Sequence, residues 1–287
     1  MIIDYASSPP LPAFRPKQRG HLTNYDRVYA NSQQGIGPQG NKHDLEDYLS
    51  QCAAAGLDRV ILHARDVETT FGLKVSNEDV AAFCRDHGPR FLGFAGVDPH
   101  KGVHAVDELD HAVRELGLLG LNIQCFESRL PLNDPKLYPL FEKCIALNIP
   151  VNLHVGMNFS LDSLIEYGRP LLLDRVLADF PDLKIIAAPP GWPWVQELIA
   201  VAWRHRNLYI GMVAVRPKYL AVAESGYGPL LQYGKSLLQN QIIFGSAYPL
   251  QPVARAYEEV RALGLTGDVV AKWLGGNLST LLKIDDV

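Results

Sequence analysis

Eight short apolar runs, rich in residues that favour β-strands, recur along the 287-residue chain and constrain its fold more than any other feature. Segments with helical periodicity separate most of them; four are His43–Gly56, Ser76–Gly88, Ala105–Gly117 and Asp134–Asn148. Strands that alternate with helices imply βαβ units and a parallel sheet. Eight such units predict an α/β protein with a single-domain (β/α)8 TIM barrel over residues 1–287, with a doubly wound sheet as the alternative. The expected strands are Met1–Asp4, Arg59–Ala64, Phe91–Val97, Gly120–Gln124, Pro150–Val155, Lys184–Ala188, Asn207–Met212 and Gln241–Gly245.

Three longer segments interrupt this alternation, and each follows an expected strand: Pro9–Asn41, Phe159–Pro170 and Val215–Leu238. The first is rich in Pro, Gly, Gln and Asn, and its apolar residues show no period, so we expect a long βα loop. Loops of this length are uncommon in compact domains and are often functional. We expect all three on the side of the barrel where the strands end, which is where barrel enzymes place their active sites.

The composition excludes several classes of function. Hydrophobic residues make up 47% and charged residues 20% of the chain, as in ordinary soluble globular proteins. The formal net charge of −4 and the scattered basic residues provide no surface for nucleic acid or for an anionic membrane. No apolar stretch is long enough to span a membrane, and no signal peptide is visible. We expect a cytoplasmic protein with a small-molecule substrate and reduced cysteines, and a homo-oligomer is left open.

Most of the residues where the expected strands end are polar or aromatic. Because the C-terminal ends of barrel strands meet on one face, these side chains are the candidates for an active site. The candidates, in chain order, are Asp4, Tyr5, Ser7, Ser8, His63, Arg65, Asp66, Asp98, His100, Asn122, Gln124, Phe126, Asn152, His154, Pro189, Gly191, Trp192, Trp194, Met212, Arg216, Lys218, Ser246 and Tyr248.

Five stretches carry a resemblance to a known family. They are RFLGFAGVDPH, ELGLLGLNIQCF, YPLFEKCIALNIPVNLHVG, DFPDLKIIAAPPGWPWVQELI and IIFGSAYP. With them, nearly the whole chain resembles the amidohydrolase-related TIM barrels, a group that includes aminocarboxymuconate-semialdehyde decarboxylase and related hydrolases and hydratases. The resemblance implies the barrel fold, and it does not determine the reaction.

The resemblance also implies five metal-binding positions, and most of them have lost their ligands. The family pattern is His-x-His on the first strand, His on the fifth, often His on the sixth and Asp on the eighth. Those positions here are Ala6, Ser8, His154, Pro189 and Ala247. A catalytic zinc needs about three protein ligands, and one histidine cannot hold it. We therefore expect a metal-independent protein without a cofactor, with a site rebuilt from Asp4, His63 or Asp98 as the alternative.

Two residues are expected to carry the chemistry. His154 is the candidate general acid or base and should titrate as an ordinary imidazole; alternatively it is an inert remnant. Arg65 is the candidate clamp for a substrate carboxylate; alternatively it forms a salt bridge with Asp66 or another acid. Covalent serine catalysis is disfavoured, because neither Ser8 nor Ser246 stands in a nucleophile elbow. The expected substrate contacts are Tyr5, Ser8, His63, Asn122, Gln124, Trp192, Arg216, Ser246 and Tyr248.

Three functions remain open on the sequence. The first choice is hydrolysis of a small cyclic or aromatic carbonyl or carboxylate compound, at a lactone or at a C–O or C–C bond. The second is decarboxylation of an aromatic or unsaturated acid, which the family also includes. The third is a barrel that binds a ligand without catalysis.

Overall fold

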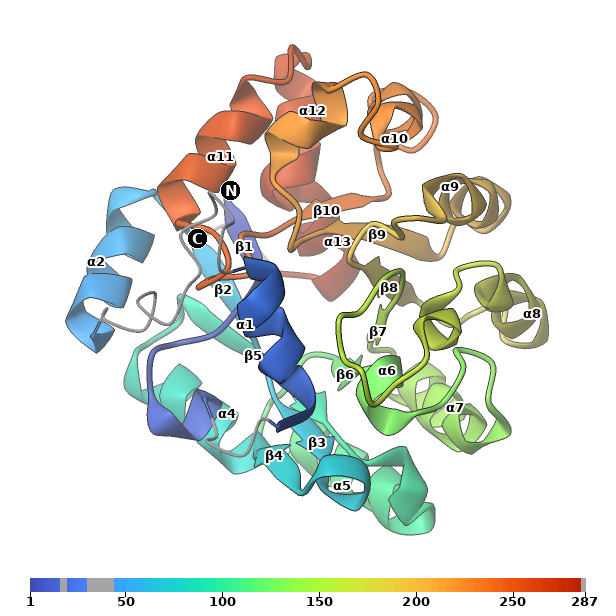
Figure 1. Ribbon diagram of the computed structural model, residues 1–287. Helices are drawn as coiled ribbons and strands as arrows, with labels where there is room; N and C mark the ends of the chain where they lie inside the picture. Colours follow the sequence, from blue (N-terminus) through green and yellow to red (C-terminus); the bar gives the residue numbers. More distant parts are fainter. Residues whose placement is uncertain (16–19, 30–43, 285–287) are drawn as a thin grey trace.

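The eight expected strands form one parallel sheet in a computed structural model that describes residues 1–15, 20–29 and 44–284. Their order is β1-β2-β5-β6-β7-β8-β9-β10, and they curve into a barrel with helices outside it (Figure 1). The (β/α)8 barrel is thereby confirmed and the doubly wound alternative is wrong. The strands are β1 (Ile3–Ser7), β2 (Arg59–His63), β5 (Phe91–Gly96), β6 (Leu121–Ile123), β7 (Val151–His154), β8 (Ile185–Ala188), β9 (Leu208–Met212) and β10 (Ile242–Phe244).

The first and last strands are joined by the Asp4 side chain and by one backbone hydrogen bond. Within the described residues, ladder pairing joins every neighbouring pair of strands except β1 and β10. At that seam the Ser246 backbone N–H donates to Asp4 Oδ1 at 2.5 Å, and the Ser8 N–H donates to the Tyr248 carbonyl at 3.0 Å. A Cβ atom at Gly245 would lie 1.8 Å from the Tyr5 carbonyl oxygen, so this close approach requires glycine.

Helices form the outer layer of the barrel (Figure 1). Their apolar faces pack on alternate strand residues such as Val60 and Leu62, whereas Ile61 and His63 point into the barrel. The same alternation turns the side chains of residues 122, 152 and 154 inward. The helices are α2 (Leu45–Ala54), α4 (Asn77–Asp86), α5 (Val103–Arg114), α7 (Tyr138–Leu147), α8 (Leu172–Asp179), α9 (Val195–Arg204), α10 (Gly228–Gly234), α11 (Val253–Arg261), α12 (Gly267–Ala271) and α13 (Asn277–Leu282).

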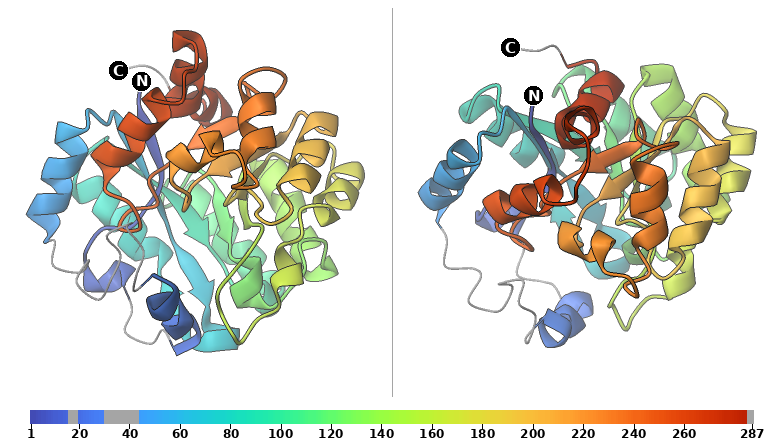
Figure 2. Two further views of the ribbon diagram at one scale, coloured as in Figure 1. Left: turned by 45° about the horizontal axis from the view of Figure 1, so that its top comes forward. Right: turned by 90° about the horizontal axis from the view of Figure 1, so that it is seen from above.

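The first long insertion contains a helix that its sequence did not predict. Helix α1 (Thr23–Tyr29) lies across one end of the barrel, whereas the N-terminus lies at the other end (Figures 1 and 2). Residues 16–19 and 30–43 of this insertion lie outside the described residues. The apolar residues of α1 show no helical period because this helix buries none of its side chains completely.

A small hairpin, also not expected, follows β2. Strands β3 (Arg65–Val67) and β4 (Leu73–Val75) pair antiparallel around the short helix α3 (Glu68–Phe71). Asp66 in this hairpin binds Lys74 at 3.1 Å and Lys101 at 2.7 Å, so its carboxylate is not the partner of Arg65. No helix in the described part of the chain is long and apolar enough to cross a membrane.

Candidate active site

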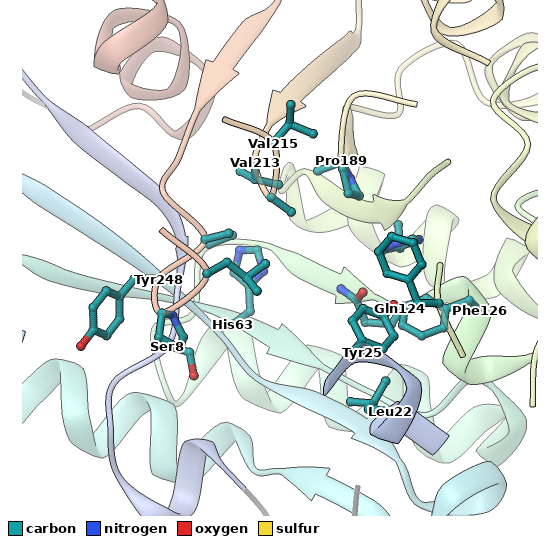
Figure 3. Close-up of a pocket in the computed structure, with 18 of the residues that line it drawn as sticks. Ser8, Leu22, Tyr25, His63, Gln124, Phe126, Pro189, Val213, Val215 and Tyr248 are labelled. Carbon is teal, nitrogen blue, oxygen red and sulfur yellow. The ribbon is translucent and has the colours of Figure 1, made fainter. Parts of the chain in front are cut away.

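A cavity of about 1160 Å³ opens at the end of the barrel that α1 crosses. All three long insertions contribute side chains to it, among them Tyr25, Phe159 and Tyr227, so the expectation that they lie over one face with His154 is confirmed for the described residues. Figure 3 shows Tyr25, Gln124 and Phe126 on one side of this cavity and Ser8 and His63 on the other. The cavity is therefore the place where the strand-end residues meet.

His154 ends strand β7 and is 8% exposed. Its ring lies 4.6 Å from that of Phe126, and its Nδ1 atom is buried with no hydrogen-bond partner in the described residues. Burial lowers the pKa of His154 to about 4, although the nearby Glu127 carboxylate acts in the opposite direction. The expectation of an ordinary imidazole is therefore wrong, because burial keeps His154 neutral at pH 7.

His63 ends strand β2 and is also held neutral. Its ring stacks on Phe94 at 5.2 Å and meets the edge of Tyr5 at 4.9 Å. Burial lowers the pKa of His63 to about 3. The cavity therefore presents two uncharged imidazoles, on strands β2 and β7.

Arg65 pairs with Glu127, an acid that the sequence analysis did not single out. Glu127 lies in the short helix α6 (Cys125–Ser128) and is fully buried. Arg65 Nη1 lies 3.3 Å from both of its carboxylate oxygens, and His21 Nε2 donates to Oε1 at 2.7 Å. Burial by itself raises the pKa of Glu127, but the charge of Arg65 and the His21 hydrogen bond outweigh it and hold the pKa below its usual value.

The salt-bridge alternative for Arg65 thus holds in part, with Glu127 in place of Asp66. Only Nη1 of the guanidinium is used in the described part of the chain: Nε is buried without a hydrogen-bond partner there, and Nη2 has no partner there either. Arg65 still lines the cavity. It therefore keeps Nη2 available for an anion.

Four side chains form a hydrogen-bonded network below His154. The Tyr5 hydroxyl donates to Asn152 Oδ1 at 2.8 Å, and Asn152 Nδ2 donates to Asn122 Oδ1 at 2.8 Å. Gln124 Nε2 donates to the same Asn122 oxygen at 2.9 Å, and Asn122 Nδ2 donates to the Ala64 carbonyl at 2.8 Å. Asn122, Gln124 and Asn152 line the cavity, as expected for the first two.

Two expected substrate contacts lie outside the cavity lining, and a third faces away. Tyr5 is fully buried inside the barrel, where its hydroxyl binds Asn152. The Ser246 hydroxyl donates to Asp4 Oδ2 at 2.7 Å, so it helps to join β1 and β10. Tyr248 borders the cavity, but its ring packs against Tyr48 at 4.8 Å and points away from the other labelled side chains (Figure 3). These positions correct the expectation, because strand-end location does not determine where a side chain points.

The other expected contacts border the cavity. Arg216 is 8% exposed, and its guanidinium binds Glu259 of α11 through both Nε, at 3.0 Å, and Nη2. Ser8 lines the cavity, and Trp192 stands at its rim, 42% exposed. Trp194 is not among the lining residues, in line with a packing role for one of the two tryptophans.

The Pro- and Gly-rich loop that contains Trp192 gives the cavity its shape. The Met157 N–H donates to the Trp192 carbonyl at 2.8 Å, and the Gly156 N–H donates to Gly168 at 2.7 Å. A Cβ atom at Gly156 would lie 2.9 Å from the Trp192 carbonyl oxygen. The loop therefore ties the insertion after β7 to the barrel.

All five positions that the family resemblance assigns to a metal line this one cavity. Their side chains supply one imidazole, from His154, and one hydroxyl, from Ser8. The described residues contain no group of three or more His, Cys, Asp or Glu side chains that could hold a metal ion. Asp4 and Asp98, considered as replacements, are occupied by Ser246 and by the backbone N–H groups of residues 69 and 100. These donors do not fit the metal of the family.

Comparison with known proteins identifies the family. The sequence profile described as Amidohydrolase matches residues 25–283. The chain belongs to the amidohydrolase family. A gamma-resorcylate decarboxylase from Rhodococcus jostii (strain RHA1) is 22% identical over 288 residues, covering 85% of each chain.

Solved structures agree with this fold. An uncharacterized TIM-barrel protein from Bordetella bronchiseptica has a TM-score of 0.80 and 30% identity, with 98% of each chain covered. A 5-carboxyvanillate decarboxylase from Sphingomonas paucimobilis has a TM-score of 0.71 and 20% identity, with 99% of each chain covered, and at that identity the likeness shows the fold alone.

Proposed function

We propose that this amidohydrolase-family protein is a decarboxylase that releases CO₂ from an aromatic or unsaturated carboxylic acid without a bound metal. The relative from Rhodococcus jostii bears the name of a decarboxylase of an aromatic acid. The hydrolysis that was the first choice from the sequence has no comparable support from this relative. Decarboxylation is therefore the better proposal.

One observation carries this proposal: the Arg65 guanidinium, whose Nη2 is unpaired in the described residues, and the His154 imidazole border the same aromatic-walled cavity. Arginine N–H groups bind carboxylates through charge-assisted hydrogen bonds. Phe126, beside His154, and Phe159 supply apolar ring surfaces for a flat substrate. A carboxylate on Arg65 would place the ring of an aromatic acid between these walls.

The chemistry requires one proton. When the bond between the ring carbon and the carboxylate breaks, its electron pair stays on carbon, a proton takes the place of the carboxyl group, and CO₂ leaves. We assign that proton to His154, which lines the cavity. It is neutral in the free protein, but a carboxylate bound in the cavity adds negative charge, which favours the imidazolium.

In place of a metal, the hydrogen-bonded network at the cavity floor can stabilise the transition state. Asn122, Asn152 and Gln124 hold their amide dipoles in fixed directions at the cavity floor. Fixed dipoles stabilise charge that develops in a transition state without having to reorganise.

The test is a direct assay of CO₂ release from a panel of hydroxybenzoic acids and unsaturated acids, run beside a panel of lactones. The proposal expects CO₂ from at least one acid and no lactone hydrolysis. Hydrolysis of a lactone without CO₂ release from any acid would support the hydrolase instead. Acids that raise the melting temperature but are never consumed would support a binding barrel.

A further inference from the structure

The hydrogen-bond directions at the cavity floor follow from one backbone group. The Ala64 carbonyl can only accept, so the group of Asn122 that lies 2.8 Å from it is the amide nitrogen. The Asn122 oxygen must then accept from the amide nitrogens of both Asn152 and Gln124, at 2.8 and 2.9 Å. Asn152 consequently turns its oxygen toward the Tyr5 hydroxyl.

The last side chain of this network is Gln124. Its nitrogen is committed to Asn122, so its Oε1 atom is left over. Oε1 has no hydrogen-bond partner in the described residues, yet it is not among the buried unpaired atoms, so it is reachable from the cavity that Gln124 lines. The floor therefore offers an amide oxygen that can only accept.

Gln124 borders the same cavity as His154. In the pairing of β6 and β7, Ile123 is opposite Leu153; the chain then continues to Gln124, directly after β6, and to His154, the last residue of β7. Neighbouring strands lie about 4.8 Å apart, so Gln124 and His154 start from adjacent strand ends. Figure 3 shows Gln124 beside Phe126, the aromatic neighbour of His154.

We infer that Gln124 is a specificity-determining residue that accepts a hydrogen bond from a hydroxyl group of the substrate. A substrate without an O–H or N–H donor there leaves the amide oxygen desolvated and unpaired, which costs more than a hydrogen bond contributes. The substrate class is thus narrowed to carboxylic acids that carry a hydrogen-bond donor, which the inference assigns to a hydroxyl group on the ring. That the substrate is a carboxylic acid rests on the proposed function. That it carries a hydroxyl group rests on the hydrogen-bonded network alone.

The experiment measures equilibrium binding of matched ligand pairs to the full chain by calorimetry. Each pair is a hydroxybenzoate and the methoxybenzoate with the substituent at the same ring position, 2, 3 or 4. For the wild type we expect the hydroxy acid of one pair to bind about tenfold more tightly, the effect of one hydrogen bond to a desolvated acceptor. Gln124→Met keeps the length of the side chain but removes the acceptor. In this variant the ratio of the two dissociation constants should fall to about one.

A matched control separates loss of the acceptor from a general loosening of the network. Tyr5→Phe removes the far end of the network, outside the cavity lining, and leaves Gln124 in place. It should lower the melting temperature and keep the hydroxyl preference.

The outcomes distinguish this inference from the proposed function. A preference that persists in Gln124→Met overturns the inference, whether or not CO₂ is released. A preference that is lost in Gln124→Met but kept in Tyr5→Phe supports it, even if no acid is decarboxylated. If the wild type binds no member of any pair, or binds both members of every pair equally, the inference is overturned.

Discussion

Arg65 donates to the buried carboxylate of Glu127 through a single nitrogen, Nη1, which lies 3.3 Å from each oxygen. This contact gives the guanidinium its orientation while the rest of it stays unpaired within the described structure. Arg216 is the opposite case, because two of its nitrogens bind Glu259. The two arginines border one cavity, so they form a matched pair for testing which of them binds an anion.

Arg65→Gln should raise KM for the acid about 10- to 100-fold and change kcat much less, because it removes binding that substrate and transition state share. Arg216→Gln should change KM by less than about threefold, because two of the three guanidinium nitrogens of Arg216 already bind Glu259. Steady-state kinetics of CO₂ release on both variants gives the comparison. Equal KM values for the two variants would show that Arg65 does not bind the substrate carboxylate.

His154→Gln should lower kcat by about 10²–10⁴-fold with little change in KM, because the proton donor is lost while the carboxylate still binds. In a second variant, His154→Ala, added imidazole should restore part of the rate, since the cavity then has room for it. A variant that turns over at the wild-type rate would make His154 an inert remnant.

The free energy of unfolding should fall as the pH drops below 6.5. His63 and His154 have pKa values lowered by burial to about 3 and about 4, so the unfolded chain binds protons at a higher pH than the folded one. Their stabilising contribution is complete above pH 6.5 and is lost as the pH falls toward these values. Denaturant titrations between pH 7 and 4 measure the slope, which should flatten in His63→Phe.

Asp4 acts in the opposite direction over a different window. Burial raises its pKa to about 6, against the hydrogen bonds from Ser246, so its contribution is complete below the ordinary value of 3.8 and is lost as the pH rises through 6. Ser246→Ala removes one of those hydrogen bonds. Its loss in unfolding free energy should therefore be larger at pH 8 than at pH 5, and an equal loss at both would contradict the assignment.

Gly245→Ala should destabilise the barrel by more than about 3 kcal/mol, because its Cβ would collide with the Tyr5 carbonyl at the seam. Gly267→Ala is the control, since a Cβ there meets no atom within 4 Å and the change should stay within about 0.5 kcal/mol. Chemical denaturation of both variants provides the values. Similar losses of unfolding free energy in the two variants would contradict the requirement for glycine at the seam between β1 and β10.

Local patterns carried the sequence-based predictions that held. Apolar runs located all eight strands, and strand ends located the cavity. Pairings between distant residues could not be predicted in this way: Glu127 contacts His21 across 106 positions and Arg65 across 62. The available signal in the sequence was a Glu in CFES, directly after Phe126.

Burial and side-chain direction account for the remaining differences. The pKa of His154 depends on how completely the folded chain excludes water from the ring, which no local pattern reports. Ser246 stands at a strand end as expected, but the seam between β1 and β10 turns it toward Asp4. Location along the chain was predictable, and direction depended on barrel closure.

The most direct test of the account is CO₂ release by one protein sample before and after exhaustive treatment with a metal chelator, with elemental analysis of the same sample. Four of the five family metal positions, Ala6, Ser8, Pro189 and Ala247, have no imidazole, carboxylate or thiolate. The account therefore predicts less than about a tenth of an equivalent of zinc, iron or manganese per chain and a rate that the chelator does not change. About one equivalent of metal, with activity that is lost on chelation and restored by adding the metal back, would contradict it.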